Sequence, residues 1–176
     1  MKACFIGHRK IAGKNVKQRL IQTIEKYINI GVNDFIVGTH GEFDNLALSV
    51  LRELRNTYKD IKICVVFTTL NVLKKEDYSS IMDYYKDAET TIYDFEEQHY
   101  KRQITYSNER MIDDCDILIC YVDTDEYQSG ARIALKYAQK QNKEIVNLFR
   151  VEDRPFYGMT KEEIEKYWND VFKKKD

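Results

Sequence analysis

The sequence has few residues of the kinds that interrupt secondary structure or cross-link the chain. Its 176 residues include one proline, Pro155, and four cysteines, none of which forms a C-x-x-C pair. Without that spacing, neither a disulfide framework nor a structural zinc site is expected, and we predict no metal and no cofactor. No internal repeat or linker-like stretch interrupts the chain, so residues 1–176 are predicted to form one domain.

Long apolar runs and an excess of one charge are also absent. No run approaches the roughly 18 apolar residues of a membrane span, and the N-terminal run is too short for a signal peptide. We therefore expect a cytoplasmic protein with no membrane contact. The chain has 28 Lys+Arg and 29 Asp+Glu, so it lacks a general attraction for polyanions and nucleic acid is an unlikely partner.

Short apolar runs alternate with amphipathic stretches along the chain. The runs span residues 3–6, 35–37, 61–67, 117–122 and 145–149, and because they lack strict alternation they predict strands buried on both faces. Apolar stripes at helical spacing span residues 16–28, 46–54, 133–138 and 164–172, and the last follows a Thr160-Lys161-Glu162-Glu163 capping box. This alternation predicts an α/β, Rossmann-like fold with a mostly parallel sheet and helices on both faces.

Residues 71–106 form the least regular stretch. It contains six tyrosines, and a short strand is expected at 91–95. Amphipathic aromatic side chains suit half-buried positions, so these tyrosines either cover the sheet edge or belong to a flap.

Polar, glycine-bearing segments follow three of the predicted strands. Ligands of open parallel sheets bind outside the carboxyl ends of the strands, so these segments are the candidate site. They are Gly7-His8-Arg9, Gly38-Thr39-His40-Gly41-Glu42-Phe43-Asp44 and Ser129-Gly130-Ala131. The third fits a phosphate held at a helix N-terminus, although a turn capped by serine explains it equally well. Gly7 to Lys14 has one residue too many for a P-loop, and no G-x-G-x-x-G is present.

The side chains of these segments suggest roles. Arg9 suits a phosphate or carboxylate, and His8 and His40 suit hydrogen bonding near neutral pH. Glu42 and Asp44 suit ribose hydroxyls or an oxocarbenium ion at an N-glycosidic bond, or they stabilise the start of a helix.

Asn108 and Arg110 are two further candidates, but they lie about 200° apart around a helix. Both therefore cannot face one ligand from a regular helix, and Arg110 could instead pair with Asp113.

Four segments together resemble the SLOG superfamily of Rossmann-like proteins, relatives of DprA and of the LOG phosphoribohydrolases. They are Phe5-Ile6-Gly7-His8-Arg9, the glycine-bearing stretch from Val37 to Ala47, Asn108-Glu109-Arg110-Met111-Ile112 and Ser129-Gly130-Ala131. The chain looks most like a branch of small bacterial and phage proteins. The resemblance implies a nucleotide-recognising fold whose ligand-binding residues lie in these four segments.

The sequence departs from that pattern at several points. Ser129-Gly130 stands where the branch has Gly-Gly, and Ser107 stands where it has Arg. The P-G-G-x-G-T-x-x-E signature of the LOG hydrolases is missing, so Glu42 and Asp44 are catalytic candidates by position alone.

Three functions remain open. The preferred one is binding of a nucleotide-derived, ADP-ribose-like or cyclic nucleotide-like signal by a sensor or sequestering protein, including in conflict between phage and host. The alternatives are an N-glycosidase acting on a nucleoside monophosphate and a single-stranded DNA binder. A homo-oligomer is also possible, because parallel-sheet proteins of this size often dimerise through their helices.

Overall fold

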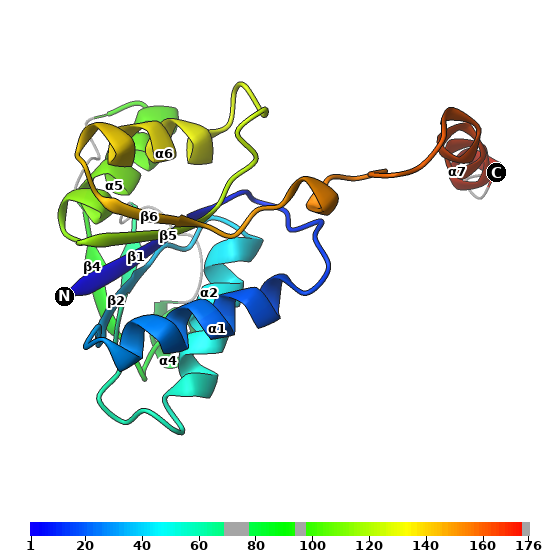
Figure 1. The fold of residues 1–176 in the computed structure, drawn as a ribbon. Helices are drawn as coiled ribbons and strands as arrows, with labels where there is room; N and C mark the ends of the chain where they lie inside the picture. Colours follow the sequence, from blue (N-terminus) through cyan, green and yellow to red (C-terminus); the bar gives the residue numbers. More distant parts are fainter. Residues whose placement is uncertain (69–77, 94–97, 174–176) are drawn as a thin grey trace.

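The computed structural model describes residues 1–68, 78–93 and 98–173, which contain a parallel six-stranded sheet with helices on both faces (Figure 1). The strand order is β4-β3-β2-β1-β5-β6, and every neighbouring pair runs parallel. The strands are β1 (Lys2–Gly7), β2 (Asp34–Val37), β3 (Lys62–Phe67), β4 (Glu89–Ile92), β5 (Ile117–Tyr121) and β6 (Glu144–Asn147). The chain builds the sheet outward from β1 to β4 and then returns to the other side of β1. The strand order therefore reverses between β1 and β5.

The helices bury one core on each side of the sheet. On one face lie α1 (Val16–Asn29), α2 (Glu42–Leu54) and α4 (Tyr78–Tyr84), and on the other α5 (Tyr100–Asp113) and α6 (Gly130–Lys140) (Figure 1). Successive residues of a strand point to opposite faces, so Phe5 enters the core under α1 and α2 while Cys4 enters the core under α5 and α6. Four of the five apolar runs lie in strands that are mostly buried. The run at 145–149 instead enters the edge strand β6, whose Ile145 and Val146 are only half-buried, so burial on both faces is wrong for this strand. The α/β Rossmann-like prediction is confirmed.

The irregular stretch at residues 71–106 contains more regular structure than its sequence predicts. It holds α4, β4 and the first half of α5, and β4 begins two residues before the predicted strand. The predicted end of that strand, Phe95, lies outside the described residues.

The chain ends in a short helix, η1 (Val151–Asp153), and in α7 (Lys161–Lys173), which lies away from the sheet (Figure 1). The capping box before α7 is confirmed, because the Thr160 N–H donates to Glu163 at 2.7 Å and the Glu163 N–H donates to Thr160 Oγ1 at 3.3 Å. Across the described residues, none of the helices combines the length and apolar character needed to cross a bilayer.

Candidate functional site

The reversal of strand order between β1 and β5 identifies the place where a ligand would enter this fold. Loops that follow β1 and β5 lead to helices on opposite faces of the sheet, which opens a crevice at their carboxyl ends. The β1–α1 loop carries Gly7-His8-Arg9, and the β5–α6 loop ends in Ser129 at the start of α6. The β2–α2 loop carries Gly38 to Gly41 on the neighbouring strand. The sheet therefore brings the three predicted segments to one edge.

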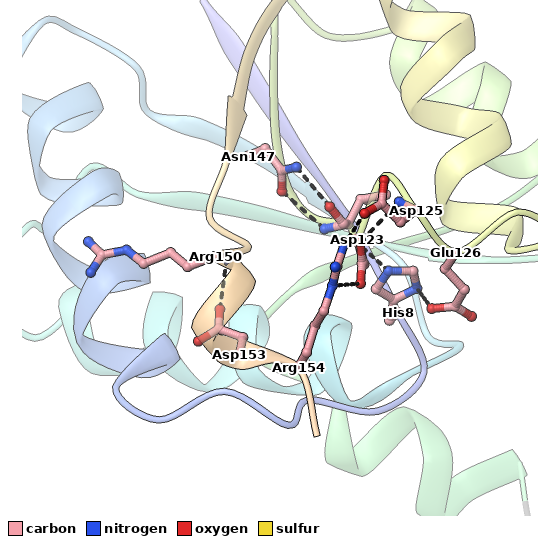
Figure 2. Close-up of polar contacts among 9 residues, drawn as sticks. His8, Asp123, Asp125, Glu126, Asn147, Arg150, Asp153 and Arg154 are labelled. Carbon is pink, nitrogen blue, oxygen red and sulfur yellow. Dashed lines mark hydrogen bonds and ion pairs between the residues drawn. The ribbon is translucent and has the colours of Figure 1, made fainter. Parts of the chain in front are cut away.

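His8 joins the first loop to the β5–α6 loop. Its Nε2 accepts the Asp123 N–H at 2.7 Å, and its Nδ1 lies 3.3 Å from Glu126 Oε2 (Figure 2). An accepting Nε2 places the proton of a neutral imidazole on Nδ1, where it faces the Glu126 carboxylate. His8 thus holds two loops together.

The start of α2 is fixed against the first loop by hydrogen bonds to the backbone of that loop. The Glu42 N–H donates to Arg9 O at 3.0 Å, and Glu42 Oε2 accepts the Ile11 N–H at 2.8 Å. A Cβ at Gly41 would lie 2.9 Å from Arg9 Cα, so only glycine permits this approach of the two chains. Arg9 itself remains exposed at the junction.

Asp44 is the buried carboxyl of the site. Its Oδ2 accepts the His40 N–H at 2.8 Å, and the Gly41 N–H also donates to this carboxyl. Burial raises the Asp44 pKa to about 6, and the two backbone donors oppose that rise. Asp44 therefore shapes the turn before α2 from inside the protein.

His40 contacts Thr68, a buried residue directly after β3. Burial lowers the His40 pKa, and the nearby Arg9 guanidinium lowers it further. Its imidazole is therefore predominantly neutral at physiological pH.

The end of β6 and the segment that follows it hold the β5–α6 loop. The Asn147 side chain exchanges two hydrogen bonds with the backbone of Val122, at 2.8 and 3.0 Å. Arg154 then binds Asp123 through two hydrogen bonds of 2.7 Å and also contacts Asp125 (Figure 2). This bidentate pair lowers the Asp123 pKa. Residues 147–154 thus fix the shape of the β5–α6 loop.

The N-terminus of α6 presents free backbone donors. Ser129 Oγ caps the helix by accepting the Arg132 N–H at 3.1 Å, which leaves the Gly130 and Ala131 N–H groups without an acceptor in the described structure. The Arg132 guanidinium lies 4.5 Å from the centre of the Tyr127 ring. Two free amides and a nearby cation can hold an anion.

The two α5 candidates differ in position. Arg110 lies in the last turn of α5 and pairs with Asp114 at 3.1 Å. The chain then reaches the amino end of β1, where the Asp116 N–H donates to Lys2 O. Arg110 therefore lies at the edge of the sheet opposite the site, paired with Asp114 rather than with Asp113. Asn108 is half-buried earlier in α5.

Sequence reasoning missed four residues that shape the site: Thr68, Asp123, Asn147 and Arg154. Thr68 and Asp123 each follow an apolar run, so the rule that selected the other loops could have found them. No local pattern marks Asn147 or Arg154. A 620 Å³ groove lies between the β1–α1 loop, α1 and α2, and Ile11 and Leu46 are among the residues that line it. The described residues contain no group of three or more metal-ligating side chains.

Comparison with known families matches residues 4–153 to the model of the YspA SLOG family. No curated protein matches the chain. The match spans most of β1, the other five strands and all three loops of the candidate site, and it ends at η1, before α7. The chain therefore belongs to the YspA SLOG family.

Proposed function

We propose that this protein binds a nucleotide-derived small molecule, of the ADP-ribose or cyclic nucleotide kind, across the carboxyl ends of β1, β2 and β5. The free Gly130 and Ala131 N–H groups at the start of α6 carry the proposal. They are suited to a phosphate, and the exposed Arg9 would supply its countercharge. The ribose would lie toward the β2–α2 loop, near Thr39 and His40.

Binding without turnover fits the carboxylates better than catalysis does. Glu42 and Asp44 both accept backbone N–H groups of the loops that form the site. A catalytic nucleophile needs a lone pair free to reach the substrate, whereas these carboxylates already hold Ile11 and His40. We therefore assign both residues to shaping the ligand loops.

Calorimetric titration with ADP-ribose, AMP and a cyclic dinucleotide tests the proposal. We expect at least one of them to bind and the Arg9→Ala variant to bind it about tenfold or more weakly, as the loss of a charged hydrogen bond predicts. Arg110→Ala is the matched control, since it removes the same charge at the opposite edge of the sheet. Binding by no probe, or equal losses in the two variants, would contradict the proposal.

An N-glycosidase is the second candidate, and the pKa of Asp44, about 6, is the observation that favours it. A carboxyl that holds its proton close to neutral pH is suited to protonate a departing base. Incubation with AMP and NAD followed by chromatography tests this activity. Release of free base that disappears in Asp44→Asn would establish hydrolysis and replace the binding-only proposal.

A further inference from the structure

Two cysteines that are far apart in the sequence meet in the core beneath α5 and α6. Cys4 lies in β1 and Cys115 lies in the turn between α5 and β5, and both belong to the apolar cluster on that face of the sheet. Their sulfur atoms lie 3.1 Å apart, at a sequence separation of 111 residues. Both are free thiols, and a disulfide requires the two sulfurs to close to about 2 Å. The reduced pair is therefore close to the geometry of a bond.

The parallel pairing of β1 with β5 brings the two side chains together. Cys4 is opposite Leu118 in the register of these strands, and both side chains enter the same core. The chain reaches β5 beside the amino end of β1. There the Lys2 N–H donates to Asp116 Oδ2 at 2.8 Å, and the Asp116 N–H donates to Lys2 O at 2.9 Å. These two hydrogen bonds hold the turn that carries Cys115 against β1.

The two thiols have different chemical surroundings. Burial raises the pKa of the Cys4 thiol well above its usual value. The hydrogen bond with the Cys4 thiol lowers the pKa of Cys115, burial opposes this shift, and the nearby Lys143 ammonium supports it. Lys143 is held beside the turn, because its Nζ donates to Cys115 O at 2.6 Å. Cys115 therefore supplies the thiolate of the pair, and Cys4 supplies a neutral thiol.

Cys115 is also the sulfur that lies nearer to solvent. Only 2% of Cys115 is exposed, but its neighbours in the turn are half-buried Asp114 and exposed Asp116. Surface turns open locally at a much lower free-energy cost than strands inside a sheet do, and a small oxidant can enter through such an opening. Cys4 lies on β1, between β2 and β5 in the interior of the sheet. An oxidant therefore reaches Cys115 first.

We propose that Cys4 and Cys115 are a redox-active pair that hydrogen peroxide converts to a disulfide. The Cys115 thiolate attacks one peroxide oxygen, so an S–O bond forms and the O–O bond breaks. The hydroxide that leaves takes a proton from solvent, which replaces the proton that Cys115 released. The Cys4 sulfur then attacks the Cys115 sulfenic acid, and the S–O bond breaks as the S–S bond forms. The hydroxyl group leaves as water with the Cys4 proton. In total, one peroxide is reduced to two waters and two thiols are oxidised to one disulfide.

Peptide mapping after oxidation tests the pair. The reduced full chain is treated with hydrogen peroxide, its remaining thiols are alkylated in denaturant, and the protein is digested without reductant for mass spectrometry. We expect a disulfide that joins Cys4 to Cys115, with Cys64 and Cys120 alkylated. Cys64 is the internal control, because it is half-buried and oxidation governed by exposure alone would modify it first. A disulfide between any other two cysteines, earlier oxidation of Cys64, or a chain with all its cysteines alkylated overturns the proposal.

Two alanine variants test the separate roles of the sulfurs. In Cys4→Ala the Cys115 sulfenic acid has no thiol to attack it, so we expect dimedone, which traps sulfenic acids, to label Cys115. In Cys115→Ala the remaining Cys4 thiol is protonated, and peroxide should oxidise it about tenfold or more slowly than it oxidises the wild-type pair. Cys120→Ala is the matched control, since it removes a third cysteine from the same core and should form the disulfide at the wild-type rate. Dimedone labelling of Cys4 in place of Cys115, or equal rates in the three variants, contradicts these roles.

Thermal denaturation tests whether the disulfide fits the native fold. A bridge across 111 residues restricts the unfolded chain, so the oxidised wild type should melt about 5 °C or more above the reduced protein. Dithiothreitol should reverse this shift, and peroxide should cause no such shift in Cys4→Ala. An oxidised wild type that melts at or below the reduced protein would show that the bridge forms only in a distorted chain, which overturns its assignment as a native redox site.

Discussion

At the scale of single residues, Asp44 links burial to pH. Its pKa is raised from 3.8 to about 6 in the folded protein, so the folded state binds this proton more tightly than the unfolded chain does. The free energy of unfolding should therefore fall as the pH rises from about 4 through 6. In Asp44→Asn this component is absent, and the stability of the variant relative to wild type should increase by about 2 kcal/mol between about pH 4 and pH 7.

Urea denaturation at several pH values measures this difference. Asp60→Asn is the control, since it removes a carboxyl of the same kind from an exposed position on the turn before β3. Parallel stability profiles for Asp44→Asn and wild type would show that Asp44 does not titrate as its burial implies.

Two glycines of the candidate site offer a second test at this scale. A Cβ at Gly7 would lie 2.5 Å from the Phe43 ring, whereas one at Gly130 would meet nothing within 4 Å. We expect Gly7→Ala to lower the free energy of unfolding by about 1–3 kcal/mol through overpacking. Gly130→Ala should cause no loss of stability, because alanine is favoured in a helix. Equal effects in thermal denaturation would show that the β1–α2 contact is looser than described.

At the scale of elements, one buried ion pair attaches η1 to α1. The Arg19 guanidinium contacts Asp153 at 2.5 Å, both side chains are largely buried, and Arg19 Nε has no acceptor in the described part of the chain. Asp153→Ala would leave a buried cation unpaired, at a cost of about 3–5 kcal/mol. Lys86→Ala, which breaks the exposed pair with Asp83, should leave stability unchanged. Urea denaturation of both variants measures the contrast, and a small loss in Asp153→Ala would mean that water reaches Arg19.

The elements also show which parts of the fold a single sequence can reveal. A strand buried on both faces can be predicted from its apolar run. The parallel topology then predicts that the loops after such strands lie at one edge of the sheet. By contrast, β4 is an edge strand with mostly exposed side chains, and α5 buries the polar residues Gln103 and Ser107, so neither has a clear apolar period.

The site itself was predictable only in part. Its glycine-bearing loops lie next to predicted strands, so topology alone selects them. The contacts of Arg154 with Asp123 and of Asn147 with Val122 join segments about 25 to 31 residues apart, and nothing local to either residue indicates the pairing. Arg110 shows the opposite case. It belongs to one of the segments predicted to bind the ligand, but helix α5 carries it to the edge of the sheet opposite the candidate site.

At the scale of the whole molecule, the family match and the core clusters both end before α7. Residues 4–153 match the family, and the described residues of α7 contribute to neither core. A chain ending at Met159 keeps Arg154 and its contacts with Asp123 and Asp125. We therefore expect this truncated chain to fold and to unfold cooperatively.

Its thermal stability should be close to that of the full chain. The described residues of α7 contribute no side chain to either core cluster, so removing the helix deletes no buried apolar contact of the sheet. We therefore expect the Tm values of the two chains to agree within a few degrees. Scanning calorimetry of both chains at one protein concentration makes the comparison. A truncated chain that melts about ten degrees or more below the full chain would show that α7 stabilises the domain through contacts that its exposed aromatic residues do not indicate.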